Sequence, residues 1–212
     1  IYLDSNIKNT PKVSNIVDLC KEKKINIQYL NRDKITNLCK TEDHQGACAN
    51  VTYSSLPFAK LSLKEDGAYI YISEATYEHN VGAIIRTAEC LGLDGVIIPS
   101  HINITPLIAK ISTGAIFNID IVQVGIYQAI KFFSDNDFKI IGIERNGKRF
   151  FEEDIKANVL FIIGGEDKSL SEQIRNKCNS ILEIPQQGHT NSLNMSVATG
   201  IVIGEHIRQK LS

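Results

Sequence analysis

The most apolar run of the chain is Val159-Leu160-Phe161-Ile162-Ile163, and Gly164-Gly165-Glu166 follows it directly. Five consecutive apolar residues bounded by glycine are typical of a strand that is buried on both faces, as in a parallel sheet. Two glycines at the end of such a strand let the backbone approach a ligand closely, although an ordinary turn uses glycine equally well. The stretch therefore predicts a buried strand with a candidate site at its end.

Similar strand-length runs occur on both sides of this one. They are Tyr69–Ile72, Gly95–Ile98, Ile119–Val124, Phe138–Ile143 and Ile181–Ile184. Between the first two, apolar residues recur at helical spacing, namely Val81, Ile84, Ile85, Ala88 and Leu91. Asn80 is placed to cap the start of that helix and Gly92 to end it.

Three more helix starts can be identified from capping residues. Thr105-Pro106 combines an N-cap with proline at the first helical position. The Ser169-x-x-Glu172 spacing of a capping box predicts a helix through about Cys178. A closing helix is expected from Asn194 to Lys210. Such alternation of strands and helices predicts an α/β fold, with a parallel sheet covered by helices on both faces.

The first 48 residues form a smaller predicted βαβα unit. Its elements are a strand over 1–4, a helix over 13–23 that starts near Thr10-Pro11, a strand over 25–30 and a short helix over 33–39. We expect one domain over residues 1–50, a linker over 51–66 and the main domain over 67–212. The first four residues have the pattern of the middle of a strand, so we expect the sequence to begin inside a domain.

The composition argues against several classes of protein. The net charge is −1, which excludes a strongly basic nucleic-acid-binding chain, although residues 1–66 hold 10 Lys and Arg against 8 Asp and Glu. Five cysteines without Cys-x-x-Cys spacing predict free thiols in a reducing, cytoplasmic compartment and no metal site. No apolar run approaches the ~18 residues that span a bilayer, so we expect neither a signal peptide nor a membrane contact.

Two polar clusters stand beside apolar runs. Asn80, Gly82 and Arg86 lie at the start of the first main-domain helix, where a cap, a turn and a solvated arginine are the plainest explanation. Arginine also suits phosphate recognition, at an edge of the sheet where α/β proteins bind ligands. Ser192-Leu193-Asn194 precedes the last helix, where Asn194 fits an N-cap. Phosphate-loop, dinucleotide-binding and Ser-His-Asp patterns are absent from the sequence.

Taken in order, three stretches resemble the motifs of the SpoU/TrmH-type RNA 2′-O-ribose methyltransferases of the SPOUT superfamily. The first is Asn80-Val-Gly-Ala-Ile-Ile-Arg86-Thr-Ala88, the second runs over 162–171, and the third over 184–198. The resemblance covers about residues 67–212. The N-terminal unit resembles part of an L30e-like RNA-binding domain, with His44-Gln45-Gly46 near its end and its first helices absent.

This resemblance implies a C-terminal trefoil knot, a homodimer with sites at the interface, and S-adenosylmethionine as the cofactor, with no metal. The cofactor-binding residues that it implies are Thr113, Gly114, Glu144, Gly164, Gly165, Glu166, Ile184, Gln186, Ser192, Leu193 and Asn194. The catalytic residues that it implies are Arg86, Asn80, Glu166, Ser192 and Asn194. Arg86 acts either as the base for the ribose hydroxyl or as an orienting, charge-stabilising group.

Two departures from the family pattern leave an alternative open. Ser169 stands where the family usually has glycine, and Gln186 where methionine is common. They motivate a catalytically inactive methyltransferase-like module that only binds RNA. A Rossmann-type oxidoreductase also fits the strand and helix alternation, but it lacks the glycine fingerprint. The N-terminal unit favours ribosomal RNA over transfer RNA as the substrate, and accessible ribose hydroxyls favour structured RNA loops.

Overall fold

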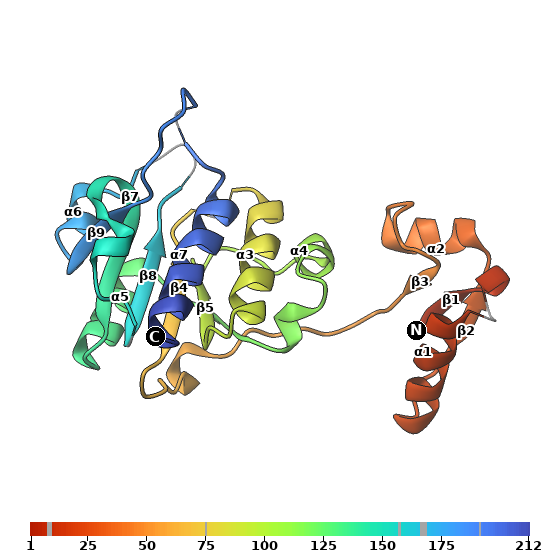
Figure 1. Cartoon of the computed structure of the whole chain (residues 1–212). Coiled ribbons are helices and arrows are strands. Elements are labelled where there is room, and N and C mark those ends of the chain that lie inside the picture. Colours follow the sequence, from red (N-terminus) through yellow and green to blue (C-terminus); the bar gives the residue numbers. More distant parts are fainter. Residues whose placement is uncertain (8–9, 75, 157, 166–168, 191) are drawn as a thin grey trace. The chain divides into compact units, whose positions relative to one another are not determined.

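The computed structural model describes residues 1–212 except 8–9, 75, 157, 166–168 and 191 (Figure 1). The chain divides into two compact units, Ile1–Tyr53 and Ser54–Ser212. Among the described residues, the first unit has a three-stranded sheet and the second a six-stranded sheet.

The N-terminal unit packs two helices with its small sheet. Its elements are β1 Tyr2–Asp4, η1 Ser5–Ile7, α1 Pro11–Glu22, β2 Gln28–Leu30, α2 Arg32–Cys39 and β3 Ala47–Cys48. β2 pairs with β1 in parallel and β3 pairs with β1 antiparallel. The Thr10 hydroxyl caps α1 by accepting from the backbone N–H of Val13 at 3.4 Å. The predicted βαβα order is confirmed. The two-residue β3 was not predicted, because so short a strand has no alternation to detect.

The second unit alternates strands and helices along the chain. Its elements are η2 Phe58–Lys60, β4 Ala68–Ile72, α3 Glu78–Cys90, β5 Gly95–Ile98, α4 Pro106–Ile111, η3 Ala115–Phe117, β6 Asp120–Gln123, α5 Ile126–Asp135, β7 Lys139–Arg149, η4 Phe150–Glu152, β8 Val159–Ile163, α6 Glu172–Arg175, β9 Ser180–Glu183 and α7 Met195–Lys210. The strand order is β6-β5-β4-β8-β7-β9, and each neighbouring pair is parallel. The predicted parallel sheet is confirmed.

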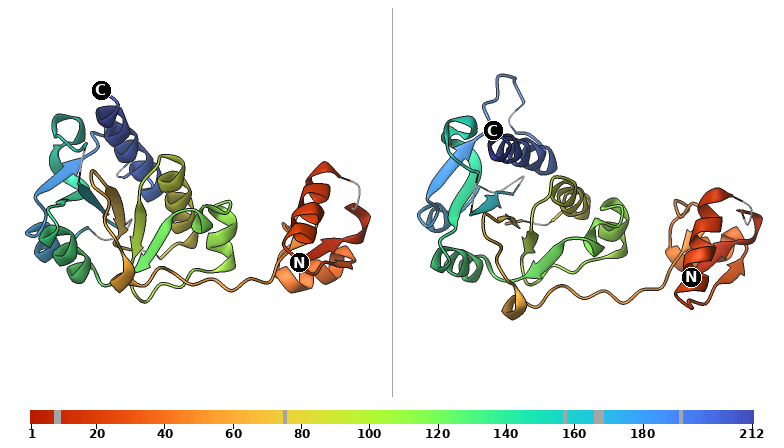
Figure 2. Two further views of the ribbon diagram at one scale, coloured as in Figure 1. Left: turned by 90° about the horizontal axis from the view of Figure 1, so that it is seen from below. Right: turned by 60° about the horizontal axis from the view of Figure 1, so that its bottom comes forward.

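Helices cover both faces of this sheet, and the strand residues alternate between them. Tyr69 of β4 contacts Phe133 of α5, with ring centroids 5.1 Å apart. Phe161 of β8 contacts His206 of α7, with centroids 5.8 Å apart. Figure 2 shows α3 and α7 on one face and α5 on the other. All five residues of β8 are buried, as its uniformly apolar sequence predicts.

The strand β7 extends beyond its predicted end at Ile143. It pairs with β9 up to Ile143, shifts register, and pairs again from Lys148. Residues 144–147 form the resulting bulge, in which Asn146 has φ of 61°. The bulge turns Glu144 away from the regular ladder and toward the carboxyl edge of the sheet.

Two predicted helix starts are wrong. α3 begins at Glu78, after Tyr77, so Asn80 lies inside its first turn and is not the N-cap. α6 begins after Ser171, whose hydroxyl accepts from the N–H of Ile174, and the helix ends at Arg175 and does not reach Cys178. Ser171 satisfies the free backbone donors there, so Ser169 is left outside the helix. The predicted stop at Gly92 is confirmed, with φ of +75° just after the helix.

The segment before β4 belongs to the second unit and packs beside its edge strand β6. The N–H of Leu56 donates to the carbonyl of Ile121 at 2.8 Å, and the Ser55 hydroxyl donates to the Gln123 side chain at 2.6 Å. Leu61 is buried in the core under α5. Part of the predicted linker over 51–66 thus covers the edge of the sheet at β6.

A buried histidine ties α7 to the segment that enters β8. His206 is 1% exposed, and its Nδ1 donates to the carbonyl of Ile155 at 2.6 Å. Burial is the main cause that lowers the pKa of His206 below its usual 6.5. In the unfolded chain the ring takes up its proton near pH 6.5, whereas the folded protein resists protonation until a lower pH.

We therefore predict that protonation of this histidine adds no pH dependence to the free energy of unfolding above pH 7, and that this free energy falls as the pH drops below about 6.5, by at most about 1.4 kcal/mol per pH unit. Chemical denaturation between pH 5 and 8 measures this dependence. His206→Gln should be less stable overall and should lack this part of the pH dependence. Equal pH slopes in the two proteins would contradict the prediction.

Candidate functional site

A pocket of about 270 Å³ opens where the bulge of β7, the loops after β8 and β9 and the start of α7 meet. Apolar walls come from Ile143, Ile163 and Ala198. Seven of the residues predicted to bind a cofactor line it, namely Glu144, Gly164, Gly165, Ile184, Gln186, Ser192 and Leu193. The carboxyl ends of parallel strands gather at one edge of a sheet, which is why segments so distant in sequence meet there.

The other predicted site residues lie elsewhere. Thr113 and Gly114 form the turn between α4 and η3, with φ of 51° and 91°, and are not among the residues that line the pocket. Glu166 lies outside the described residues. Asn80 and Arg86 belong to α3, and Asn194 precedes α7.

Asn194 links the last helix to the first predicted motif. Its side-chain NH₂ donates to the Oδ1 of Asn80 at 3.0 Å, across 114 residues of sequence. Its own Oδ1 accepts from the backbone N–H and the hydroxyl of Ser196, at 2.9 and 2.6 Å. Asn194 is therefore the N-cap of α7, as predicted, and also fixes the start of α3. Asn80 was predicted as a cap, but its side-chain oxygen holds Asn194.

Arg86 is an exposed arginine on α3, a helix with five buried residues. Its neighbours Ile85 and Ala88 are fully buried in the core, which fixes the backbone that carries it. Within the described part of the chain, no hydrogen bond or ion pair engages its guanidinium group. Because the backbone of Arg86 is fixed and its guanidinium is unpaired among the described residues, the side chain suits the binding of a phosphate or another anion.

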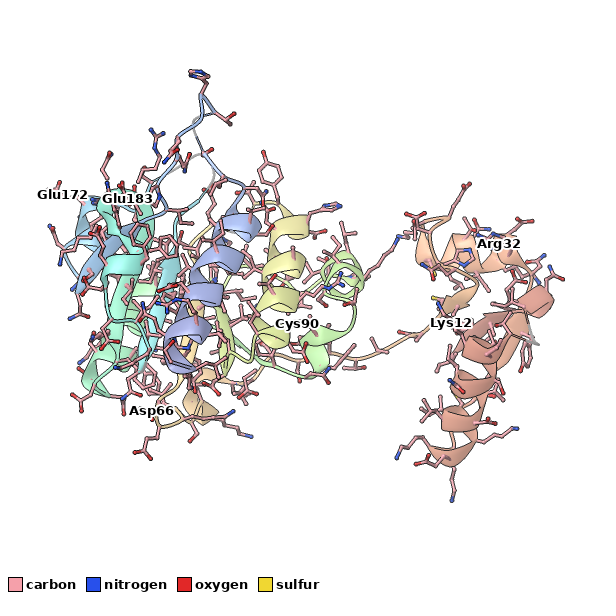
Figure 3. The ribbon with its side chains drawn as sticks, in the orientation of Figure 1. Lys12, Arg32, Asp66, Cys90, Glu172 and Glu183 are labelled. Carbon is pink, nitrogen blue, oxygen red and sulfur yellow. The ribbon has the colours of Figure 1, made fainter. Side chains whose placement is uncertain are left out.

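An ion pair fixes the carboxylate of Glu144 at the pocket. Glu144 sits in the β7 bulge, and its Oε2 lies 2.7 Å from the NH1 group of Arg175 on α6. The two side chains are 11% and 32% exposed, so the pair is well shielded from water. The bulge is held from the other side by the N–H of Asn146, which donates to Glu183 Oε2 at 2.9 Å. Figure 3 shows Glu183 at the opposite end of the sheet from Asp66.

The two glycines after β8 have different surroundings. A side chain on Gly164 would have ordinary contacts, the nearest at 3.6 Å. At Gly165 a Cβ would fall 1.7 Å from Oε2 of Glu74, because that carboxylate fills the space of the missing side chain. Gly165 thus makes room for a side chain of its own protein. Glu74 was not predicted as a site residue, although a carboxylate two residues after a buried strand at this edge was the available signal.

Other chemistries receive no support from the described residues. Within them, no cluster of three or more His, Cys, Asp or Glu side chains could hold a metal ion. Burial is the main cause that raises the pKa of the Cys178 thiol to about 11, so this thiol is a poor nucleophile at neutral pH. No helix in the described ranges is both long enough and apolar enough to cross a membrane.

Two family models match this chain. Residues 67–204 match the SpoU rRNA methylase family, and residues 1–57 match the RNA 2′-O ribose methyltransferase substrate-binding domain. The chain therefore belongs to the SpoU rRNA methylase family, and it is an RNA methyltransferase of the SpoU/TrmH type. This membership excludes the oxidoreductase alternative.

Similar proteins span nearly the whole chain. A Staphylococcus aureus protein assigned to the TrmH family of tRNA/rRNA methyltransferases is 32% identical over 220 residues, which cover 99% of this chain and 88% of that protein. A Bacillus subtilis protein of the same assignment, YacO, is 29% identical over 215 residues, covering 96% and 86%.

Solved structures share the fold. The SpoU methyltransferase AviRb from Streptomyces viridochromogenes superposes with a TM-score of 0.84 at 23% identity, over 99% of this chain and 81% of that one. An AdoMet-bound rRNA methyltransferase from Sinorhizobium meliloti gives a TM-score of 0.81 at 20% identity, over 100% and 80%. These likenesses support the SPOUT-type arrangement of sheet and helices, while the trefoil knot stays a prediction.

The shielded ion pair at the pocket gives a testable expectation. Replacing Arg175 with Met should lower the free energy of unfolding by about 1–3 kcal/mol, because it leaves the Glu144 carboxylate partly buried without its partner. Glu144→Gln in the same chain should recover part of that loss, and a double-mutant cycle in urea measures the coupling. Additive effects of the two substitutions would show that the pair contributes nothing to stability.

Proposed function

We propose that this chain transfers a methyl group from S-adenosylmethionine to a ribose 2′-hydroxyl in structured RNA. The observation that carries the proposal is the convergence of the three motifs. The second and third motifs line one pocket, and Asn194 of the third is hydrogen-bonded to Asn80 of the first. Family membership supplies the reaction class, RNA methylation.

The pocket fits the proposed cofactor. The apolar side chains of Ile143, Ile163 and Ala198 suit an adenine ring, and the backbone at Gly164 offers close approach. Ser192 and Gln186 add a hydroxyl and an amide at the same pocket. The Sinorhizobium meliloti structure is described as AdoMet-bound, and similar use of the cofactor is proposed here. When bound, S-adenosylmethionine supplies an electrophilic methyl group on its sulfonium.

The residues around the pocket then have separate roles. Arg86 contacts the RNA phosphate and stabilises the negative charge that develops on the ribose oxygen. We assign it this role and not that of a base, because guanidinium is always protonated in proteins. Asn80 and Asn194 hold each other, which orients α3 and the entry to α7, and Ser192 positions the ribose. Glu166 is proposed to anchor the cofactor loop.

Ribosomal RNA is the proposed substrate in preference to transfer RNA. The support is the match of residues 1–57 to the substrate-binding domain of RNA 2′-O ribose methyltransferases, together with the family's description as rRNA methylases. The Staphylococcus aureus relative is named for both tRNA and rRNA. Five free cysteines and an RNA substrate favour a cytoplasmic location for the protein.

A second candidate function is an inactive RNA-binding module of methyltransferase type. It is favoured by one observation, that Ser169 and Gln186, the two departures from the family pattern, both line the pocket. Calorimetry with S-adenosylmethionine separates the two proposals. Binding of S-adenosylmethionine with micromolar affinity supports an active methyltransferase. No detectable binding supports an inactive RNA-binding module.

The transfer itself can be tested by mapping ribose methylation. RNA from cells that lack this protein should lose one 2′-O-methyl group, and the purified protein with S-adenosylmethionine should restore it to that RNA. Restoration on ribosomal RNA would support the proposed substrate. Restoration on transfer RNA alone would overturn the substrate, and methylation of a base would overturn the 2′-hydroxyl as the acceptor.

Arg86→Ala should reduce methyl transfer by at least about 10²-fold, because the developing alkoxide loses its charge partner. S-adenosylmethionine affinity and the melting temperature should stay unchanged, since the guanidinium is exposed on α3. Lys131→Ala is the matched control, because it removes an exposed positive charge from α5 on the other face. Turnover by Arg86→Ala at the wild-type rate would contradict the role given to Arg86.

The chain is also proposed to form a homodimer. Val197 and Ile201 are 50% and 36% exposed and stand one turn apart on α7, so they present an apolar strip next to the candidate site. Replacing both with Asp should convert the protein to a monomer, because two copies would then bury like charges. Light scattering after size exclusion measures the mass. A wild-type monomer, or an unchanged double variant, would contradict the proposal.

A further inference from the structure

The carboxylate of Glu74 is placed unusually for a charged group. It follows β4 by two residues and fills the space left by the missing side chain of Gly165, which lines the pocket. Its Oε1 accepts from the hydroxyl of Thr76 at 3.2 Å. Its Oε2 is buried and, among the described residues, has no hydrogen-bond partner.

Glu144, the carboxylate that lines the pocket, differs from Glu74 because it has a charge partner. Glu144 is paired with Arg175, so its charge is balanced within the protein. No ion pair balances Glu74 in the described part of the chain. A carboxylate with one oxygen buried and unsatisfied is costly, and proteins keep such a group mainly where a positive charge arrives. The position against Gly165 points to the occupant of the pocket as the source of that charge.

We propose that Glu74 is a specificity-determining residue that recognises the positive charge of S-adenosylmethionine through the field of its carboxylate. This inference rests on the proposed function, which puts the cofactor in the pocket. S-adenosylmethionine carries one more positive charge, on its sulfonium, than the product S-adenosylhomocysteine, a neutral thioether. The carboxylate therefore favours binding of the substrate over binding of the product.

The mode of action is electrostatic and not by direct contact. Glu74 is not among the residues that line the pocket, whereas Gly165, against which its carboxylate packs, does line it. Charges that are shielded from water interact over several ångströms with little screening by salt. The small residue at 165 lets the carboxylate come this near, because any Cβ there would displace it.

Calorimetry on the purified full chain tests the proposal, with S-adenosylmethionine and S-adenosylhomocysteine as the two probes. Glu74→Gln keeps the shape of the side chain and removes its charge. It should weaken binding of S-adenosylmethionine about tenfold while leaving S-adenosylhomocysteine within about twofold, in low and in high salt. Glu65→Gln is the matched control, because this exposed carboxylate precedes β4 by three residues, beside Asp66 at the far end of the sheet (Figure 3). It should change neither affinity.

Melting curves without ligand separate this role from a structural one. Glu74→Gln should raise the melting temperature of the empty protein, because an unbalanced buried charge is removed, and should reduce the rise that S-adenosylmethionine produces. Glu74→Asp, which keeps the charge, should retain the preference for S-adenosylmethionine.

Three results would overturn the inference. They are equal weakening of both probes by Glu74→Gln, no weakening of either, and a lower melting temperature with the ratio of affinities unchanged. Failure of the wild-type protein to bind either probe is a different result, because it overturns the proposed cofactor together with this inference. Binding of S-adenosylmethionine with an unchanged ratio in Glu74→Gln overturns only the role of Glu74.

Discussion

The parallel pairing of β8 between β4 and β7 is the constraint on which the rest of the second unit depends. β8 is in register with β4 from Val159 to Ile163 and with β7 from the same residue. Because the three strands run in one direction, their carboxyl ends meet at one edge. Gly164, the β7 bulge and Glu74 are neighbours for this reason alone. A slip of one residue would turn the buried aromatic rings of β4 to the opposite face.

The edge of the sheet also explains how a neutral chain can hold a charged site. Glu144 is balanced by Arg175, whereas Arg86 and Glu74 have no charge partner among the described residues. Arg86, a cation on α3, and Glu74, an anion that packs against Gly165, suit a reaction between an anionic nucleic acid and a cationic methyl donor. Membership of the SpoU rRNA methylase family agrees with that division.

The strands were predictable because their residues are apolar on both faces, and the capped helices because Thr105 and Asn194 stand where caps belong. The start of α3 was missed because Tyr77 makes no side-chain cap, so its residue type carries no signal. The β7 bulge and Glu74 were missed for a different reason: both depend on which strands become neighbours. A candidate site at Gly164 and Gly165 was predicted from the buried strand that precedes them. The cofactor role of the pocket residues came only from the family resemblance, which also named Thr113 and Gly114, and these two do not line the pocket.

A crystal structure of the protein with S-adenosylmethionine bound tests the central claim most directly. The account predicts that the cofactor lies in the pocket between Gly164–Gly165 and Ile184–Gln186, with its sulfonium on the side of Glu74. It also predicts that Arg86 stays free to meet the RNA. Cofactor density outside this pocket, or a sulfonium turned away from Glu74 toward Glu144, would contradict it.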